Sequence, residues 1–212
     1  MLKRSGLPPE EIERLSLELV TARMPALPGL SEDERYVAQR IVRAEGEPDI
    51  ALSVRFSPGA VERGVEAFRN GAAIIADVRM VEVGTSKALL RDFATSITTL
   101  IDSPQIAASA RAASITRSAA AMQALQASIT GAIVAIGNAP TALLALLDMI
   151  DSGDSLPALV IGMPVGFVAC AESKAELTKR QVDYITIEGF RGGSSAACAT
   201  LNALMTLAKR ER

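Results

Sequence analysis

Short apolar runs rich in Ile and Val alternate with helical segments along most of the chain. Several of these runs show no polar alternation, which is typical of strands that are covered on both faces. Strands separated by helices form mainly parallel sheets joined by right-handed crossovers. We therefore expect an α/β fold, built as three α/β/α layers around a mainly parallel sheet. The five runs are AAIIADV (72–78), TSITTLI (95–101), GAIVAIG (131–137), ALVIG (158–162) and YITIE (184–188).

Spacing, capping and stop signals predict the other elements. Apolar residues recur at helical spacing after Pro8, and Ser31 with Glu34 has the capping-box pattern of a second helix start. The run DIALSVRF (49–56) alternates apolar and polar residues, which predicts a strand, and Ser57 then has the character of a helix N-cap. The predicted helices span about residues 8–24, 32–44, 57–70, 102–128, 141–150, 171–180 and 194–209.

The length of 212 residues favours one domain. We expect a single domain over 1–212, with N-terminal helices over about 8–44 and an α/β core over about 48–208. Twenty-two Lys and Arg face 24 Asp and Glu, and the net charge of −2 gives no general attraction to nucleic acid or to anionic membranes. Aromatic residues make up only 3 % of the chain, which is few for stacking on single-stranded nucleic acid.

The chain contains no histidine. This absence excludes Ser-His-Asp and Cys-His catalysis, histidine-ligated zinc and an imidazole acid or base near neutral pH. Two cysteines, Cys170 and Cys198, are too few for a cysteine-only zinc site, and we interpret both as small core residues. Chemistry in this protein must therefore use carboxylates, Arg or Lys, hydroxyls, backbone dipoles or the substrate itself, and we expect no metal.

The expected compartment is the cytoplasm. Two cysteines suit a reducing environment, and no run approaches the roughly 18 uncharged apolar residues of a membrane span. The start, MLKRSGLPPEE, reaches two glutamates before any apolar region, so we expect no signal peptide and no association with a membrane.

Three loops that follow predicted strands are candidates for ligand binding. Parallel sheets bind ligands at the carboxyl ends of their strands, and free N–H groups at helix starts attract anions. In the first loop, Gly137, Asn138 and Thr141 connect a strand to a helix. This segment is either an anion site or a tight turn capped by Asn138, and the local pattern favours the turn.

The second and third loops carry more conspicuous residues. GMPVGF (162–167) contains proline, which restricts the backbone, and glycine, which gives it conformational freedom. Lys174 follows at the start of a helix. The loop is either a binding segment or a structural connection with a solvated helix start. In the third loop, Arg191 precedes Gly192, Gly193 and two serines at a helix start, which is an anion-binding pattern. The segment matches neither of the two nucleotide-binding motifs, G-x-x-x-x-G-K-[ST] and G-x-G-x-x-G.

Two weaker candidates lie elsewhere. Asp77 ends a predicted strand, where either a catalytic carboxylate or a cap is expected. Arg117 and Ser118 lie in an Ala-rich helix, where the favoured interpretation is a solvent-facing arginine. The three loops together indicate a large, polyanionic, oxygen-rich ligand on one sheet edge.

Five segments resemble the precorrin-8X methylmutase family of cobalamin biosynthesis. The resemblance runs in order from about residue 8 to 207. The segments are ADVRMVEVG (76–84), TRSAAAM (116–122), IGNAPTALLALLDM (136–149), IGMPVGFVACAESK (161–174) and RGGSSAACATLNAL (191–204).

The resemblance implies an α/β isomerase without a cofactor. It also implies a homodimer that holds a tetrapyrrole near the subunit interface. The family reaction moves a methyl group from C11 to C12 of precorrin-8X, giving hydrogenobyrinate, by a [1,5]-sigmatropic shift that needs positioning rather than a nucleophile. The substrate-binding residues that it implies are Thr116, Arg117, Ser118, Asn138, Thr141, Met163, Val165, Gly166, Phe167, Lys174, Arg191, Gly192, Gly193 and Ser194.

Arg43 stands where the resemblance implies the proton-donating histidine, in the segment IVRAEG (41–46). An arginine keeps its proton throughout the physiological pH range, so it is a poor proton shuttle but a permanent cation and donor. Glu45 and Glu47 lie close by in sequence and become proton donors only if burial raises their pKa values. Two functions remain open: a methylmutase that uses Arg43 differently, and a family member that only binds or carries a tetrapyrrole.

Overall fold

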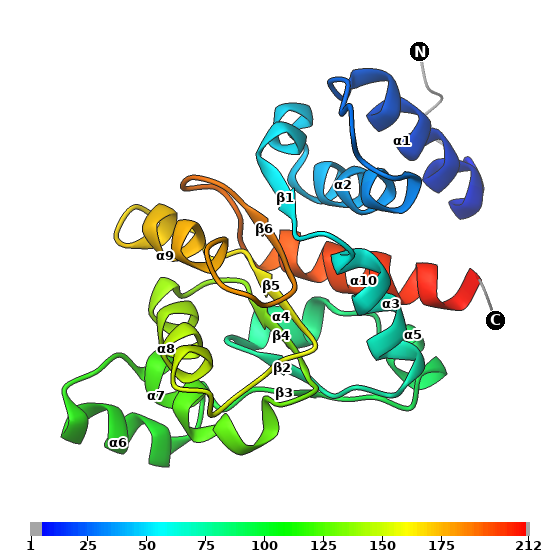
Figure 1. The fold of residues 1–212 in the computed structure, drawn as a ribbon. Coiled ribbons are helices and arrows are strands. Elements are labelled where there is room, and N and C mark those ends of the chain that lie inside the picture. The colour runs from blue at the N-terminus through cyan, green and yellow to red at the C-terminus, as the bar shows by residue number, and fades with distance from the viewer. Residues whose placement is uncertain (1–5, 211–212) are drawn as a thin grey trace.

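The computed structural model describes residues 6–210 and contains a six-stranded sheet (Figure 1). Its strand order is β1-β6-β5-β4-β2-β3, and every neighbouring pair is parallel except β1 with β6. The mainly parallel sheet expected from the sequence is therefore present. The strands are β1 (Val54–Phe56), β2 (Ile74–Ala76), β3 (Ile97–Thr98), β4 (Ile133–Ile136), β5 (Leu159–Gly162) and β6 (Tyr184–Ile187).

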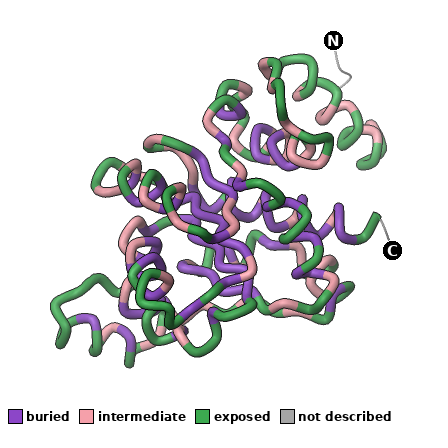
Figure 2. The backbone as a smooth tube through the Cα atoms, viewed as in Figure 1, coloured by how far each residue is buried: buried purple, intermediate pink, exposed green. Residues whose placement is uncertain are grey.

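Helices cover both faces of the sheet. Alternate strand residues point into two separate cores: Ile133 packs in one core and Val134 in the other. Burial on both faces explains why the strands read as unbroken apolar runs. The three-layer α/β/α expectation is thus confirmed, and the buried segments of Figure 2 follow the sheet and its covering helices. One face packs against α3 (Ala60–Arg69) and α10 (Ser194–Arg210), and the other against α7 (Arg117–Ala124), α8 (Pro140–Asp151) and α9 (Cys170–Leu177).

Two N-terminal helices extend the first face. Helix α2 (Glu32–Glu45) begins at the predicted capping box of Ser31 and packs on α10. Helix α1 (Pro9–Arg23) lies outside α2, farther from the sheet, and buries none of its residues (Figure 1). No helix among residues 6–210 is both long and apolar enough to cross a membrane. The expectation about a signal peptide rests partly on residues 1–5, which lie outside the described range.

The strand predicted over residues 49–56 was wrong over residues 49–53. Residues Pro48–Ser53 form a short 3-10 helix, η1, in which the adjacent Ile50 and Ala51 are both buried while Leu52 is exposed. Only β1 is extended, and it pairs antiparallel with β6. The following helix begins at Ala60 rather than Ser57, because Gly59 takes the left-handed conformation before it.

The long helix predicted over residues 102–128 was also wrong. The chain forms α6 (Pro104–Ala113), α7 and a short 3-10 helix, η2 (Gln126–Ser128). Ser114 takes a left-handed conformation with φ of 54°, and Thr116 then caps α7 by accepting from the N–H of Ala119. Two further helices were not predicted, namely α4 (Arg79–Gly84) and α5 (Lys87–Asp92).

Candidate functional site

The three candidate loops meet at the carboxyl edge of the sheet. The Gly193 N–H donates to the Met163 carbonyl at 2.8 Å, and the Gly166 N–H donates to the Phe190 carbonyl at 3.2 Å. The Val165 N–H reaches the Asn138 carbonyl at 3.4 Å. The loops after β4, β5 and β6 are therefore joined by their own backbones, as parallel strands with a common edge require.

Gly192 allows the closest approach between two of these loops. Its φ of 141° is a conformation that residues with a side chain rarely adopt. A Cβ atom here would lie 2.7 Å from the Met163 carbonyl oxygen and 2.9 Å from that of Pro164. Gly192 therefore serves the close packing of the two loop backbones in this structure.

Asp77 fills the turn of the first loop. Its buried carboxylate accepts from the N–H groups of Gly137 at 2.8 Å, Asn138 at 2.9 Å and Ala139 at 2.8 Å. Burial raises the pKa of the Asp77 carboxyl, and these three donors oppose that effect. The cap interpretation of Asp77 is therefore the correct one. These N–H groups are already used, so the turn is not an open anion site, and Ala139 rather than Asn138 is the N-cap of α8.

The start of α7 lies beside the start of α8. The Thr116 hydroxyl donates to the Thr141 hydroxyl at 2.7 Å, which joins the TRSAAAM segment to the first loop. Arg117 is exposed at the first turn of α7 rather than within a long helix, and Ser118 is half-buried. This exposed guanidinium and the two threonines can donate to a ligand at this end of the edge.

Arg43 lies on α2 and is held by a glutamate from α1. Its guanidinium is 3.0 Å from the Glu13 carboxylate, and Arg40 is 2.7 Å from the same oxygen. Hydrogen bonds from Arg40 and then Arg43 hold the pKa of Glu13 below its ordinary value. All three line a cavity of about 480 Å³ with Ser195. Sequence reasoning missed Glu13, since nothing local links residues thirty positions apart.

The end of α2 is fastened to the third loop. The Ser195 hydroxyl donates to Glu45, and Arg191 forms an ion pair with Glu47. Arg191 also donates to the Ser53 hydroxyl at 3.2 Å. These contacts place the Arg43 segment beside the RGGSS loop, and they also engage the charge of Arg191. Ser195, rather than the buried Ser194, presents its hydroxyl here.

Four of the predicted ligand residues are buried, namely Met163, Lys174, Gly193 and Ser194, and Lys174 is only 1 % exposed. The Lys174 ammonium donates to the carbonyls of Pro164 and Arg191. Of the two alternatives for this loop, the one with a solvated helix start is therefore wrong for this lysine. Both cysteines are buried, as the core interpretation required.

An apolar patch projects from the same edge. Phe167 is 85 % exposed and Phe190 is 50 % exposed, and their ring centroids are 5.5 Å apart. Val165 and Val168 are exposed beside them. Phe190 and Val168 were missed by sequence reasoning, although both belong to loops that it had singled out. Exposed aromatic rings of this kind indicate a surface that another molecule covers.

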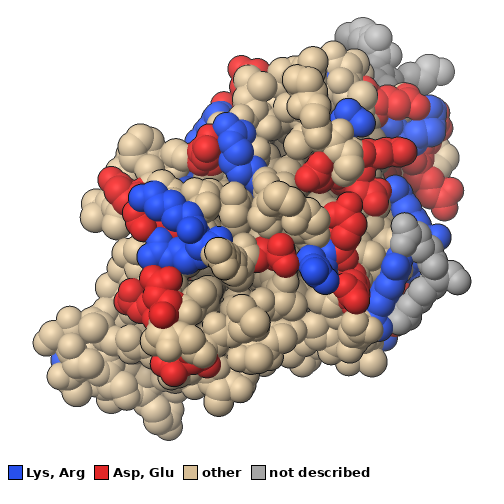
Figure 3. Space-filling model, in the orientation of Figure 1, with Lys and Arg blue, Asp and Glu red and all other residues tan. Residues whose placement is uncertain are grey.

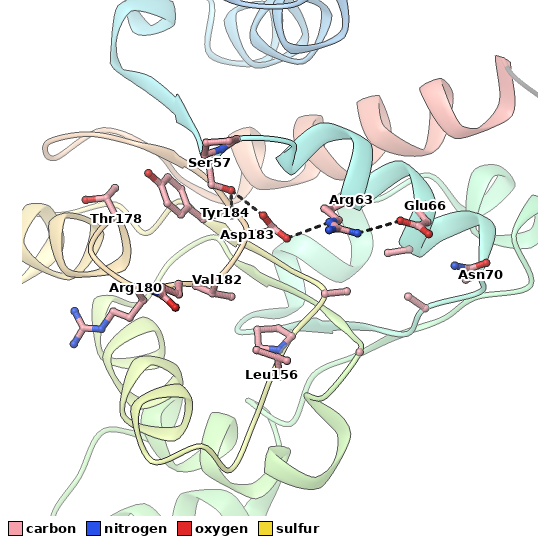
Figure 4. Close-up of a pocket in the computed structure, with 17 residues that line it drawn as sticks. Ser57, Arg63, Glu66, Asn70, Leu156, Thr178, Arg180, Val182, Asp183 and Tyr184 are labelled. Atoms are coloured by element: carbon pink, nitrogen blue, oxygen red, sulfur yellow. Dashed lines mark hydrogen bonds and ion pairs between the residues drawn. The ribbon is translucent and has the colours of Figure 1, made fainter.

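The opposite edge of the sheet also carries a cavity, of about 700 Å³ (Figure 4). Arg63 lies between Asp183 at 3.7 Å and Glu66 at 3.6 Å, and Ser57 donates to Asp183. These charges are compensated by one another, and the cavity lies at the amino ends of the strands. It is therefore a weaker candidate than the carboxyl edge.

Charged side chains are interspersed elsewhere on the surface. On the face shown in Figure 3, basic and acidic groups lie next to one another over most of the charged area. Among residues 6–210, no group of three or more Cys, Asp or Glu side chains is arranged to hold a metal ion.

A precorrin-8X methylmutase family model matches residues 11–207. The chain belongs to the precorrin-8X methylmutase family. A cobalt-precorrin-8 methylmutase from Priestia megaterium is 40 % identical, over 94 % of this chain and 88 % of that protein. A precorrin-8X methylmutase from Pseudomonas aeruginosa is 42 % identical, over 85 % of this chain and 87 % of that protein.

A solved precorrin-8X methylmutase from Thermus thermophilus has the same fold. It superposes with a TM-score of 0.88 at 39 % identity, covering 95 % of this chain and 97 % of that one. The family is one of isomerases in cobalamin biosynthesis, so the methylmutase resemblance drawn from the loops is confirmed.

Proposed function

We propose that the protein is an isomerase that moves a methyl group from C11 to C12 of precorrin-8X, giving hydrogenobyrinate. One observation carries the proposal for this chain. The segments that resemble the methylmutases, far apart in sequence, form one continuous edge of hydrogen-bonded loops beside Arg43 and an exposed aromatic pair. A [1,5] methyl shift needs no nucleophile or metal, so such an edge supplies what the reaction needs.

Positioning is the main task of this site. The exposed or half-buried polar groups are suited to bind the peripheral carboxylates of a tetrapyrrole, and they are Thr116, Arg117, Ser118, Asn138, Thr141 and Arg191. Val165, Gly166 and Phe167 offer an apolar surface for the macrocycle. Gly192 and the buried Met163, Gly193, Ser194 and Lys174 support these groups from beneath. Holding the macrocycle in one geometry and tautomer lowers the barrier of a unimolecular rearrangement.

Arg43 supplies a permanent positive charge in this site. Its guanidinium can donate hydrogen bonds to a ring nitrogen or a carboxylate, but it does not release a proton under physiological conditions. The ion pair with Glu13 fixes the guanidinium at the cavity that it shares with Ser195. Arg43 therefore stabilises the reacting tautomer by charge rather than by proton transfer.

We further propose a cytoplasmic homodimer with the site near the subunit interface. The exposed apolar patch of Val165, Phe167, Val168 and Phe190 supports this assembly. An apolar patch of this kind typically marks a surface that contacts another protein or a ligand. The patch borders the proposed ligand groups, so both the second subunit and the bound macrocycle contribute to covering it.

A spectrophotometric assay tests the reaction. When purified protein is mixed with precorrin-8X, we expect the visible spectrum of the tetrapyrrole to change as hydrogenobyrinate forms. The rate of this change should be proportional to the protein concentration. Tight binding with an unchanged spectrum over a long incubation would reject the isomerase and leave a tetrapyrrole carrier. Absence of any binding would reject both.

A further inference from the structure

Lys174 has an unusual environment for a lysine. It lies in the middle of α9, is 1 % exposed, and no carboxylate among residues 6–210 lies within ion-pair distance of it. A buried ammonium without a counter-ion is unfavourable unless other groups solvate it. Burial accordingly lowers the pKa of Lys174.

Two backbone carbonyls take the place of the counter-ion. The Lys174 Nζ donates to the Arg191 carbonyl at 2.7 Å and to the Pro164 carbonyl at 3.2 Å. Pro164 belongs to the loop after β5, and Arg191 to the loop after β6. One side chain therefore bridges the two loops that follow the neighbouring strands β5 and β6.

Other contacts show how closely these loops depend on one another. Cys170, one helical turn before Lys174, directs its Sγ to the Pro164 carbonyl at 3.2 Å. Above the lysine, the Gly193 N–H donates to the Met163 carbonyl at 2.8 Å. Gly192 leaves no room for a side chain between the loops. The junction between the loops after β5 and β6 is therefore held by Cys170 and Lys174 of α9 and by hydrogen bonds between the two loop backbones.

The junction carries the groups proposed to contact the substrate. Val165, Gly166 and Phe167 follow Pro164 directly, and the Arg191 side chain projects from the residue whose carbonyl Lys174 binds. A small shift of either loop would move these groups relative to one another. Misplacement of binding groups by about 1 Å reduces rates substantially, even when the chemistry lies elsewhere.

We propose that Lys174 is a positioning residue that fixes the loops after β5 and β6 in register, and that it does not itself contact the substrate. This inference rests on the proposed function for its kinetic consequence. Its structural consequence does not, because the order of the two loops can be measured without any substrate.

The test uses the full chain with Lys174→Met, and with Lys179→Met as the matched control. Lys179 is an exposed lysine that lies just beyond the same helix and forms an ion pair with Glu176. We expect hydrogen exchange in residues 163–168 and 189–193 to rise at least ten-fold in Lys174→Met, with the remaining core unchanged. The control should exchange like the unsubstituted protein.

Kinetics with precorrin-8X provide the second measurement. We expect KM to rise at least ten-fold in Lys174→Met while the fraction of folded protein stays constant, whereas a purely structural lesion would lower the active fraction and leave KM unchanged. A raised KM with unchanged loop exchange would make Lys174 a direct ligand and overturn the proposal, as would no change in either measurement.

Two remaining outcomes are also decisive. If Lys174→Met does not fold, Lys174→Gln, which keeps a shorter amide donor, replaces it, and failure of both would assign the lysine to global stability and overturn the proposal. If the unsubstituted protein neither binds nor converts precorrin-8X, the proposed function fails, while increased loop exchange in the variant would still support the positioning role.

Discussion

Single residues determine much of the chemistry at the proposed site. Arg43 stands where the resemblance implies a histidine, in a chain that has none, and Asp77 turns a possible anion site into a closed, capped turn. Both residues were singled out from the sequence, but the contacts that they make were not. Glu13 and the three N–H groups of the first loop reach them only through the folded chain.

Replacing Arg43 by histidine should increase turnover. Arg43→His restores a side chain that can give and retake a proton near neutral pH, since an ordinary imidazole pKa is about 6.5. We expect faster conversion of precorrin-8X, with a rate that falls as pH rises through that value. Arg40→His is the control, because it places an imidazole one turn earlier on α2 and leaves Arg43 in place. Equal or slower turnover in Arg43→His would show that a proton donor is not what limits this protein.

Replacing Asp77 by asparagine should destabilise the fold. One amide oxygen cannot accept from three N–H groups, and the amide NH2 would face donors in a buried turn. We expect Asp77→Asn to lower the free energy of unfolding by about 2–3 kcal/mol, measured by urea denaturation. Asp102→Asn, at an exposed ion pair with Arg79, should change it by less than about 0.5 kcal/mol. A loss no larger than that of the control would contradict the capping role.

Elements differ in how firmly the fold holds them. Helix α8 is fixed by six buried side chains, whereas α1 buries none and is attached to α2 partly through Glu13. The Ala-rich region divides into α6 and α7 at Ser114, which takes a left-handed conformation. The sequence did not predict this break, because the residues around it are uniformly small. Weakly attached elements of this kind open locally before the core unfolds.

Removing the charge of Glu13 should loosen α1. We expect Glu13→Gln to speed hydrogen exchange over residues 9–23 by about two- to five-fold, the effect of losing about 0.5–1 kcal/mol of exposed ion pairing. Glu18→Gln, which breaks only the exposed pair with Arg14 within α1, is the control. Unchanged exchange in Glu13→Gln would show that α1 is held by other contacts.

The same attachment should depend on pH in one direction. Because the arginines lower the pKa of Glu13, its contribution is complete above the ordinary glutamate pKa of about 4.3 and is lost as pH falls through the lowered value. The protection of α1 amides, that is, their exchange rate relative to the intrinsic rate at the same pH, should therefore fall at acidic pH in the unsubstituted protein and change less in Glu13→Gln.

At the scale of the whole molecule, the proposed site lies at the carboxyl edge of the sheet. Parallel strands end together, so three loops separated by up to fifty residues meet there, and α2 adds Arg43 from the N-terminal part of the chain. The apolar patch around Phe167 lies on this edge, whereas the exposed Leu156 lines the cavity on the other. The asymmetry favours assembly through the functional edge.

Placing a charge on the patch should weaken the proposed dimer. We expect Phe167→Asp to raise the dimer dissociation constant about 30-fold or more, corresponding to about 2 kcal/mol for a buried aromatic contact. Sedimentation equilibrium measures this constant, and Leu156→Asp is the control on the opposite edge. A monomeric unsubstituted protein, or an equally tight Phe167→Asp dimer, would contradict the assignment of this surface.

Local periodicity, caps and motifs were enough to predict the α/β class, the mainly parallel sheet and the three loops from the sequence, and they also predict that Arg43 stands at the position of a family histidine. It misjudged residues 49–53, where adjacent Ile50 and Ala51 both enter the core. The burial of Lys174 under two loops and the ion pair between Glu13 and Arg43 became visible only in the folded chain. Those contacts join segments far apart in the chain, and no spacing along the sequence encodes which of them meet.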